Sequence, residues 1–314
     1  MSVERLKNIQ LSLAQSGVKR ITYVGGEPFL KKELLMMSAH AQSCGLSTAV
    51  VTNGTHINRS VVEEIIRRKI FDIMIFSLDG PEFIHDSIRA IDGTFKRATD
   101  TIKNVQKLKK IRKIRYPKVF INVTISALNY DYIEPMLSIA QQLDVNAIRF
   151  LSLSCLDDTI IKKTNALFGY PAIKTHLYAV GNSFKIPEKK LPAVIEKLAH
   201  MKERAKKIGI KFQVEKYLQN GKGADTCSFL GKDFVISPYG DIYPCPMLPE
   251  YIIGNDVAIS LDKMLCDNSI QDKVKRIFEL ASNKTLPVCS QCCVEKVSLP
   301  NNAVDICKKQ MLDG

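Results

Sequence analysis

Four cysteines in the C-terminal third of the chain have the spacing of ligands for one metal centre. They are Cys227, Cys245, Cys289 and Cys292, and the last two form a C-x-x-C knuckle. The sequence DFVISPYGDIYP at residues 233–244 predicts two short strands joined by a turn at residues 238–240. Such a ribbon brings the first two cysteines to one end. Four thiolates suit a [4Fe–4S] cluster or a tetrahedral Zn²⁺, and spacing alone does not separate these metals.

A second group of motifs carries oxygen and nitrogen ligands. GGEP lies at residues 25–28, TNG at 52–54, SLDGP at 77–81, HD-x-IR at 85–89 and GTF at 93–95. Paired glycines let a ligand approach the backbone closely. Asp79 could accept hydrogen bonds from a ribose, and Arg89 could bind a carboxylate in bidentate fashion. Each motif taken alone is also compatible with a simple turn or a helix-capping acid.

Alternating strand-like and helix-like segments would position these motifs. The strand-like runs lie at residues 18–24, 46–51, 70–78, 119–126, 147–153 and 210–214. The helix-like segments lie at residues 2–16, 31–44, 60–69, 94–114, 130–143 and 188–208. The strands are apolar almost throughout, which is typical of a parallel sheet covered by helices. We therefore predict an α/β fold with the polar motifs at the carboxyl ends of the strands. Residues 154–186 have no regular pattern and are interpreted as a connector or a substrate-facing insertion.

The composition fits a folded protein that contains metal. The chain has 314 residues, of which 46% are hydrophobic and 25% charged, enough for one large α/β domain and a small appendage. No apolar run reaches the roughly 18 residues of a membrane-spanning helix, and residues 1–13 have no signal-peptide core. We therefore expect a cytoplasmic protein without membrane contact. Nine cysteines in such a protein indicate metal or redox use rather than disulfides.

The net charge favours anionic partners. Lys and Arg number 45 against 32 Asp and Glu, a net charge of +13. The basic residues are spread along the chain, and the densest run, residues 107–115, is interrupted by apolar residues as on a solvated helix face. No nucleic-acid-binding motif is visible, so the sequence does not favour a nucleic-acid partner.

In their order and spacing, GGEP, TNG, SLDGP, HD-x-IR and GTF resemble the motifs of radical S-adenosylmethionine (SAM) enzymes. The pattern C-x12-G-x4-C followed by C-x-x-C resembles the auxiliary-cluster extension of that superfamily, the SPASM/twitch domain. The resemblance covers residues 18–153 and 227–307. It implies a partial (β/α)6 TIM-like barrel that lacks its first strand, plus a small Cys-rich SPASM/twitch module. We predict a barrel at residues 1–153, a connector with a helix and a strand at 154–222, and the auxiliary-cluster domain at 223–314.

The resemblance also implies which residues bind the cofactor. In the family, the GGEP backbone holds the amino group of SAM, the SLDGP strand contacts the ribose region, and the HD-x-IR arginine lies near the SAM carboxylate. Two later strands line the nucleoside pocket. The matching residues here are Gly25, Gly26, Glu27, Pro28, Thr52, Asn53, Ser77, Asp79, Arg89, Asn122 and Leu151.

For the metal, the resemblance favours iron–sulfur over zinc. It implies one auxiliary [4Fe–4S] cluster with Cys227, Cys245, Cys289 and Cys292 as ligands and with Cys293 and Cys307 in reserve. Free cysteine is often buried, so we interpret the remaining three, Cys44, Cys155 and Cys266, as buried thiols.

The chain departs from the family at its start. The C-x-x-x-C-x-x-C loop that holds the radical-generating [4Fe–4S] cluster is absent from this sequence. The first barrel strand is absent too, which would leave unpaired backbone groups along the strand near residues 21–24. We expect either a chain that starts too late or a degenerate, non-catalytic relative.

The resemblance implies an enzyme. An intact protein of this type cleaves SAM to a 5′-deoxyadenosyl radical, which abstracts hydrogen from a peptide, protein or small-molecule substrate. The auxiliary cluster would transfer electrons, and a flavodoxin or ferredoxin would supply them. Two alternatives remain open: a non-catalytic metal- or SAM-binding scaffold, and a nucleic-acid-binding protein with a zinc knuckle.

Overall fold

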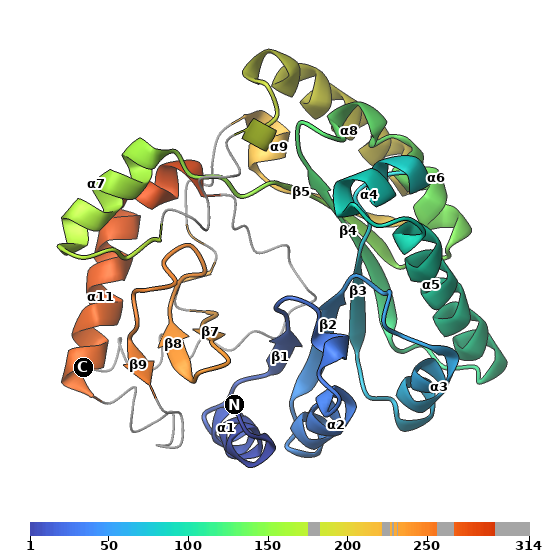
Figure 1. The fold of residues 1–314 in the computed structure, drawn as a ribbon, viewed down its shortest axis with the longest axis horizontal. Helices are drawn as coiled ribbons and strands as arrows, with labels where there is room; N and C mark the ends of the chain where they lie inside the picture. The colour runs from blue at the N-terminus through green and yellow to red at the C-terminus, as the bar shows by residue number, and fades with distance from the viewer. Residues whose placement is uncertain (175–182, 222–226, 228, 231, 256–266, 293–314) are drawn as a thin grey trace.

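Six parallel strands form one curved sheet with the strand order β1-β2-β3-β4-β5-β6 (Figure 1). This computed structural model describes residues 1–174, 183–221, 227, 229–230, 232–255 and 267–292. The strands are β1 (Arg20–Tyr23), β2 (Ser47–Thr52), β3 (Ile73–Ser77), β4 (Lys118–Ile125), β5 (Ala147–Ser152) and β6 (Lys211–Val214). All six strand-like runs in the sequence are therefore confirmed as strands.

Helices cover the convex outer face of the sheet (Figure 1). The helices on that face are α2 (Leu34–Ser43), α3 (Arg59–Arg68), α5 (Thr94–Ile111), α6 (Pro135–Gln142) and α8 (Leu191–Lys207). The other helices of this part of the chain are α1 (Val3–Gln15), α4 (Glu82–Arg89), α7 (Asp158–Phe168) and α9 (Tyr217–Asn220). Strand residues such as Phe76, Ile121 and Phe150 pack against Ile65 of α3 and Ile102 of α5 in one apolar core. A second buried cluster lies on the inner face, so both faces of the strands are buried along part of their length. This burial explains why the strands are apolar almost throughout.

The inner face of the sheet changes from apolar to polar along the strands. At its amino end, a small buried cluster comprises Ala49, Ile73, Ile75, Phe120 and Ala147. One step nearer the carboxyl ends, neighbouring strands align polar residues in register: Ser77, Asn122, Arg149 and Gln213. Successive side chains on one face lie two residues apart, so this polar row lies directly above the apolar cluster.

The C-terminal module contains three short antiparallel strands and a helix. They are β7 (Val235–Ile236), β8 (Asp241–Tyr243), β9 (Gly254–Asn255) and α11 (Asn268–Ser282). The predicted ribbon and its turn are confirmed, since β7 pairs with β8 and Gly240 takes the positive φ of +95° that the turn requires. The module lies on the open side of the curved sheet (Figure 1).

The module shares its core with two elements of the barrel half. Ile9 and Leu13 of α1 and Ile161 of α7 pack in one apolar cluster with Ile242 of β8 and Leu248. The two halves are therefore one packed structure.

Four of the described helices, α4, α7, α9 and α11, were not expected from the sequence. Helix α7 lies in the stretch predicted to be irregular, so that prediction is wrong, and α4 carries the HD-x-IR motif. Within the described residues β1 pairs only with β2 and β6 only with β5, so the sheet stays open. The predicted domain boundaries stay predictions. In the described part of the chain, no helix has the length and apolar character needed to cross a membrane.

Candidate functional site

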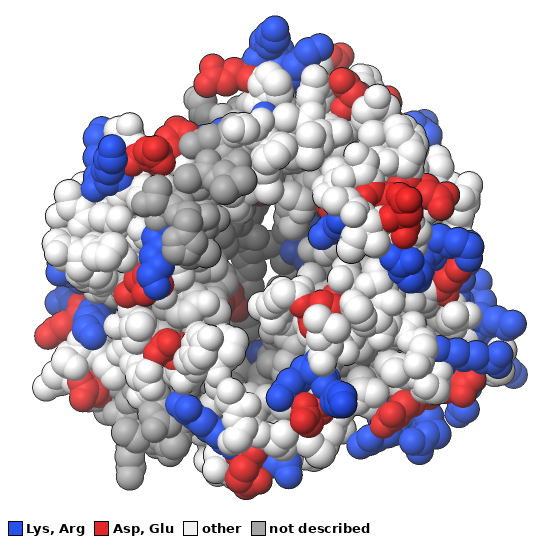
Figure 2. Space-filling model, in the orientation of Figure 1, with Lys and Arg blue, Asp and Glu red and all other residues white. Residues whose placement is uncertain are grey.

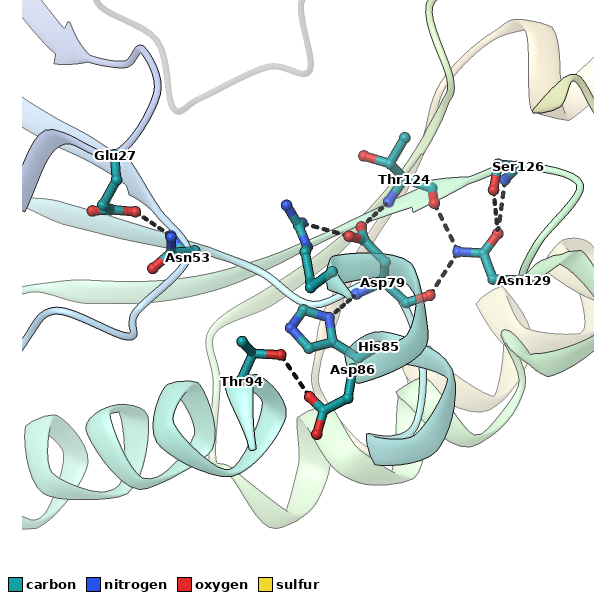
Figure 3. Close-up of polar contacts among 10 residues, drawn as sticks. Glu27, Asn53, Asp79, His85, Asp86, Thr94, Thr124, Ser126 and Asn129 are labelled. Carbon is teal, nitrogen blue, oxygen red and sulfur yellow. Dashed lines mark hydrogen bonds and ion pairs between the residues drawn. The ribbon is translucent and has the colours of Figure 1, made fainter. Parts of the chain in front are cut away.

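The Glu27 carboxylate joins the GGEP loop to the TNG turn. Its Oε1 atom accepts hydrogen bonds from the Thr52 hydroxyl (2.7 Å) and the Phe29 N–H (3.1 Å), and its Oε2 atom accepts from the Asn53 N–H (2.7 Å; Figure 3). Thr52 is the last residue of β2, and Glu27 is the N-cap of a short 3-10 helix, η1 (Pro28–Leu30). The carboxylate therefore has a structural role whether or not a ligand binds.

The paired glycines leave open space at the end of β1. Gly25 has φ = +140°, a conformation that favours glycine, and a Cβ atom added to Gly25 or Gly26 would meet no atom within 4 Å. A ligand can therefore approach this backbone closely.

At the end of β3, Asp79 lies in a dense network of hydrogen bonds. Its Oδ1 atom accepts from the Thr124 N–H (3.0 Å), and its Oδ2 atom pairs with the Arg89 guanidinium (Figure 3). Asp79 is buried, whereas the Arg89 side chain is 36% exposed. The carboxylate is therefore fixed in place, and the remaining N–H donors of Arg89 are available at the rim.

His85 and Asp86 hold the segment that presents Asp79. The Asp79 N–H donates to Nδ1 of buried His85 (3.1 Å), so the neutral ring carries its proton on Nε2. Burial lowers the pKa of His85, although nearby Asp79 opposes this effect. Asp86 accepts from the Gly93 N–H, the Thr94 hydroxyl and the Phe95 N–H and thereby caps α5. The HD and GTF motifs thus have structural roles.

Asn129 ties the ends of β3 and β4 together. Its amide nitrogen donates to the backbone oxygens of Asp79 (2.6 Å) and Thr124 (2.8 Å), and its amide oxygen accepts from the Ser126 N–H (2.7 Å; Figure 3). Asn129 is buried. The sequence analysis missed it because no motif marks a residue whose partners are backbone atoms of other segments.

The inner face of the sheet holds a buried acceptor with no donor. The Asn122 Oδ1 atom is inaccessible to solvent and has no hydrogen-bond partner among the described residues. Asn122 lies in register with Ser77 of β3, and Leu151 lies one row higher on β5. A ligand with an N–H group would satisfy this oxygen.

Three of the four predicted metal-ligating thiols lie near one another. Burial, together with the nearby Cys227 and Cys289 thiols, raises the pKa of Cys245 to about 12. Burial, together with Cys227, raises the pKa of Cys289 to about 11. Backbone N–H groups already point at two of the sulfurs, from Leu230 to Cys227 (3.3 Å) and from Met247 to Cys245. Hydrogen bonds of this kind tune iron–sulfur clusters.

The C-x-x-C knuckle forms a second 3-10 helix, η6 (Pro287–Gln291). Residues three apart eclipse in a 3-10 helix, and Cys292 directly follows η6, so Cys289 and Cys292 fall on one side of this turn. Both pack against the apolar cluster that contains Cys245. Between them, Gln291 exchanges hydrogen bonds with Asp157, whose N–H donates to the Gln291 Oε1 atom (2.8 Å). The knuckle is thus tied to the segment after β5.

The structure therefore groups the predicted site residues into two sets. Gly25–Pro28, Thr52 and Asn53 lie together, and Ser77, Asp79, Arg89, Asn122 and Leu151 follow on the next strands. Glu27 and Asn53 of the first set lie apart from Asp79 of the second in Figure 3. Cys155 is buried, as predicted, whereas Cys44 is only half-buried. Cys266, Cys293 and Cys307 lie outside the described residues.

Two family models match the chain. Residues 1–139 match the radical SAM superfamily, and residues 227–293 match an iron–sulfur cluster-binding domain, SPASM. These matches coincide with the rim motifs and with the thiol group, respectively.

The curated relatives are larger proteins, and this chain spans half or less of their length. The antilisterial bacteriocin subtilosin biosynthesis protein AlbA of Bacillus subtilis is 24% identical over 260 residues, which are 81% of this chain and 50% of AlbA. The Fe-coproporphyrin III synthase of Methanosarcina barkeri is 31% identical over 106 residues, which are 34% of this chain and 26% of that protein.

Solved structures share the fold over nearly the whole chain. The anSMEcpe structure with bound AdoMet and Kp18Cys peptide superposes with a TM-score of 0.63 at 18% identity and covers 99% of this chain and 87% of that one. SuiB of Streptococcus suis bound to S-adenosylmethionine gives 0.65 at 14% identity and covers 93% and 65%, respectively. At these identities the likeness establishes the fold alone.

Proposed function

We propose, from the premise that this chain is a radical SAM protein with a C-terminal SPASM domain, that it binds SAM along the carboxyl ends of β1–β5 and acts on a peptide. The observation that carries the SAM site is the buried, donorless Oδ1 atom of Asn122 on the inner face of the sheet. An unsatisfied buried acceptor is unfavourable, and the amino group of adenine would supply its missing donor.

The rim supplies complementary charge for the methionine end of SAM. Glu27, beside open backbone at Gly25 and Gly26, offers a negative charge to the amino group, while Pro28, Thr52 and Asn53 fix the loop around it. Arg89 has donors free for the carboxylate because Asp79 occupies only part of its guanidinium. Ser77 and Asp79 would bind the ribose region, and Leu151 would pack against the nucleoside.

The thiol group fits an auxiliary [4Fe–4S] cluster. Cys227, Cys245, Cys289 and Cys292 would hold it, with Cys293 and Cys307 as alternatives. When bound, such a cluster supplies one-electron transfer. The chain's own contribution is an apolar enclosure around the sulfurs and backbone N–H groups aimed at two of them.

Peptide chemistry is supported by the relatives. AlbA is a bacteriocin biosynthesis protein, and SuiB has been solved with its precursor peptide SuiA. We propose that this protein likewise modifies a peptide, receives electrons from a flavodoxin or ferredoxin, and works in the cytoplasm.

One cofactor of the family does not fit the residues present. The sequence given contains no C-x-x-x-C-x-x-C, so these residues offer no ligand set for the radical-generating cluster. We carry a SAM- and cluster-binding scaffold without radical chemistry as a second candidate function.

The test uses anaerobically purified whole chain. We expect about four irons with sulfide from one auxiliary cluster and SAM binding by calorimetry. One zinc and no iron would overturn the cluster. SAM binding without formation of 5′-deoxyadenosine from a supplied reductant would favour the scaffold.

A substitution of Asn122 tests the proposed SAM site separately from the metal site. Asn122→Leu should weaken SAM binding about tenfold, because one hydrogen bond of about 1–1.5 kcal/mol is lost, and should not destabilise the protein. Asn104→Leu, on the exposed face of α5, is the matched control. Unchanged affinity in Asn122→Leu would refute the proposed pocket.

A further inference from the structure

Arg149 places a positive charge on the inner face of the sheet, and no described residue supplies its counter-charge. It lies on β5, in register with Asn122 of β4 and Gln213 of β6. Its Nε atom is buried and has no hydrogen-bond partner, and no carboxylate among the described residues forms an ion pair with its guanidinium. The next residues on the same face toward the amino ends are Phe120 and Ala147, so the position borders apolar core.

The guanidinium of this half-buried side chain stays charged. Burial alone lowers the pKa of Arg149 to about 10, and no neighbouring carboxylate raises it again. This pKa lies well above neutrality, so the side chain keeps its proton. A half-buried charge without a partner in the described part of the chain opposes folding, and an apolar residue of similar size would be tolerated better. A ligand that carries a negative charge would supply a counter-charge for Arg149.

The nearest acids on the rim have other partners. The Glu215 Oε2 atom accepts from the Ser152 N–H and from the Ser152 hydroxyl (3.0 Å). Asp79 binds Thr124 and Arg89. Neither carboxylate is the counter-ion of Arg149.

The carboxylate of SAM does not explain Arg149 either. In the proposed function, the methionine end of SAM lies near Glu27 after β1 and Arg89 after β3. Arg149 lies on β5, two strands beyond β3, a lateral distance of about 10 Å at the usual strand spacing. The part of SAM that would lie over β4 and β5 is the uncharged nucleoside.

We propose that Arg149 binds a carboxylate of the substrate, so that the peptide carries an aspartate, a glutamate or a free C-terminus at this point. The planar guanidinium donates two parallel hydrogen bonds to a carboxylate, which gives both charge and orientation. Figure 2 shows that the face of the molecule in this view is hollowed at its centre, so a ligand has a route inward. This inference rests on the proposed function and names the chemistry of its substrate.

The experiment measures the thermal unfolding of the whole chain with a small probe. The probe is N-acetylglutamate methylamide, and its neutral counterpart is N-acetylglutamine methylamide. We expect the acidic probe to raise the unfolding temperature of the wild type and the neutral one to leave it unchanged. Arg149→Met should respond to neither. The control, Arg112→Met at the exposed C-cap of α5, should behave as the wild type does.

Two further measurements separate the possible sources of the carboxylate. Calorimetry should give SAM affinities within twofold for wild type and Arg149→Met, and saturating SAM should leave the acidic-probe effect in place. A tenfold loss of SAM affinity in Arg149→Met, or loss of the probe effect on adding SAM, would assign the guanidinium to the cofactor and overturn the proposal. An equal response of Arg149→Met and wild type to the acidic probe would overturn it as well.

The design also separates this inference from the proposed function. Failure to bind SAM counts against the proposed function and leaves the probe measurement interpretable. Normal SAM binding without any acidic-probe effect counts against the Arg149 subsite alone.

Discussion

Glu27→Gln separates the structural role of the GGEP acid from its proposed role in binding SAM. The carboxylate accepts hydrogen bonds from Thr52, Asn53 and Phe29. Glutamine keeps the shape but replaces one oxygen with an NH₂ group. In either orientation of the amide, this group faces a backbone N–H donor, so at least one hydrogen bond is lost.

The size of the effect follows from those contacts. A hydrogen bond to a charged group contributes about 1.5–3 kcal/mol, and the lower end applies because Glu27 is only partly buried. The variant should therefore unfold about 2–5 °C below the wild type. SAM binding should fall roughly 10- to 100-fold, because the amino group loses its negative partner.

Thr52→Val is the matched comparison. It removes the hydroxyl that donates to Glu27 and accepts from the Gly54 N–H, but it leaves the carboxylate charged. We expect a loss of stability similar to that of Glu27→Gln and a loss of SAM affinity below threefold. Calorimetry with SAM and thermal unfolding of both variants provide the measurements. If the two variants lose SAM affinity equally, Glu27 acts only through the shape of the loop and our reasoning is wrong.

Gly26→Val should fold normally, because its added Cβ meets no atom within 4 Å, yet bind no detectable SAM in calorimetry; unchanged affinity would show that the loop is only structural. Cys245→Ala should lose the iron and destabilise the C-terminal module, whereas Cys155→Ala, which removes a buried thiol elsewhere, should keep the iron; equal iron loss would refute the ligand set. The pKa of His85 is lowered in the folded state, so its neutral form stabilises the protein fully above about pH 6.5, and this contribution should be lost as pH falls further. Urea unfolding from pH 8 to 5 should show a steeper decline for the wild type than for His85→Asn, and identical slopes would contradict the assignment.

The sheet could be predicted because its signals are local. Each strand is a short apolar run that ends in a polar motif, and helix-like segments separate the runs. This pattern predicts that the strands run parallel to one another. The ribbon before Cys245 could also be predicted, since Gly240 marks a turn that needs positive φ. The pairing of β1 through β6 adds register, which the pattern did not contain.

The roles of the motif residues were harder to predict. Asp86 and His85 look like site residues in the sequence, but Asp86 caps α5 and His85 accepts the Asp79 N–H. Asn129 and Arg149 carry no motif at all. Their importance depends on whether hydrogen-bond partners lie near them in the folded chain. A single sequence does not show these contacts before the fold is known.

Helix α7 was missed for a related reason. Its apolar side is narrow, with Ile161 among its few buried residues, and it packs on the C-terminal module rather than on the sheet. A periodicity search finds helices that bury a broad stripe, so a helix with so narrow an apolar side gives a weak signal.

This shared packing couples the thiol group to the barrel half. Cys245 belongs to the same apolar cluster as Leu13 of α1 and Ile161 of α7, and Gln291, between Cys289 and Cys292, binds Asp157 just before α7. Without metal, the Cys245 and Cys289 thiols keep their protons at neutral pH because their pKa values are raised, so the sulfurs rest as neutral groups in an apolar core. Metal binding must displace those protons, and the free energy of binding then contributes to the stability of every element in that core. Loading of the auxiliary site should therefore stabilise α1 and α7 as well as the module, because all three contribute to this one core.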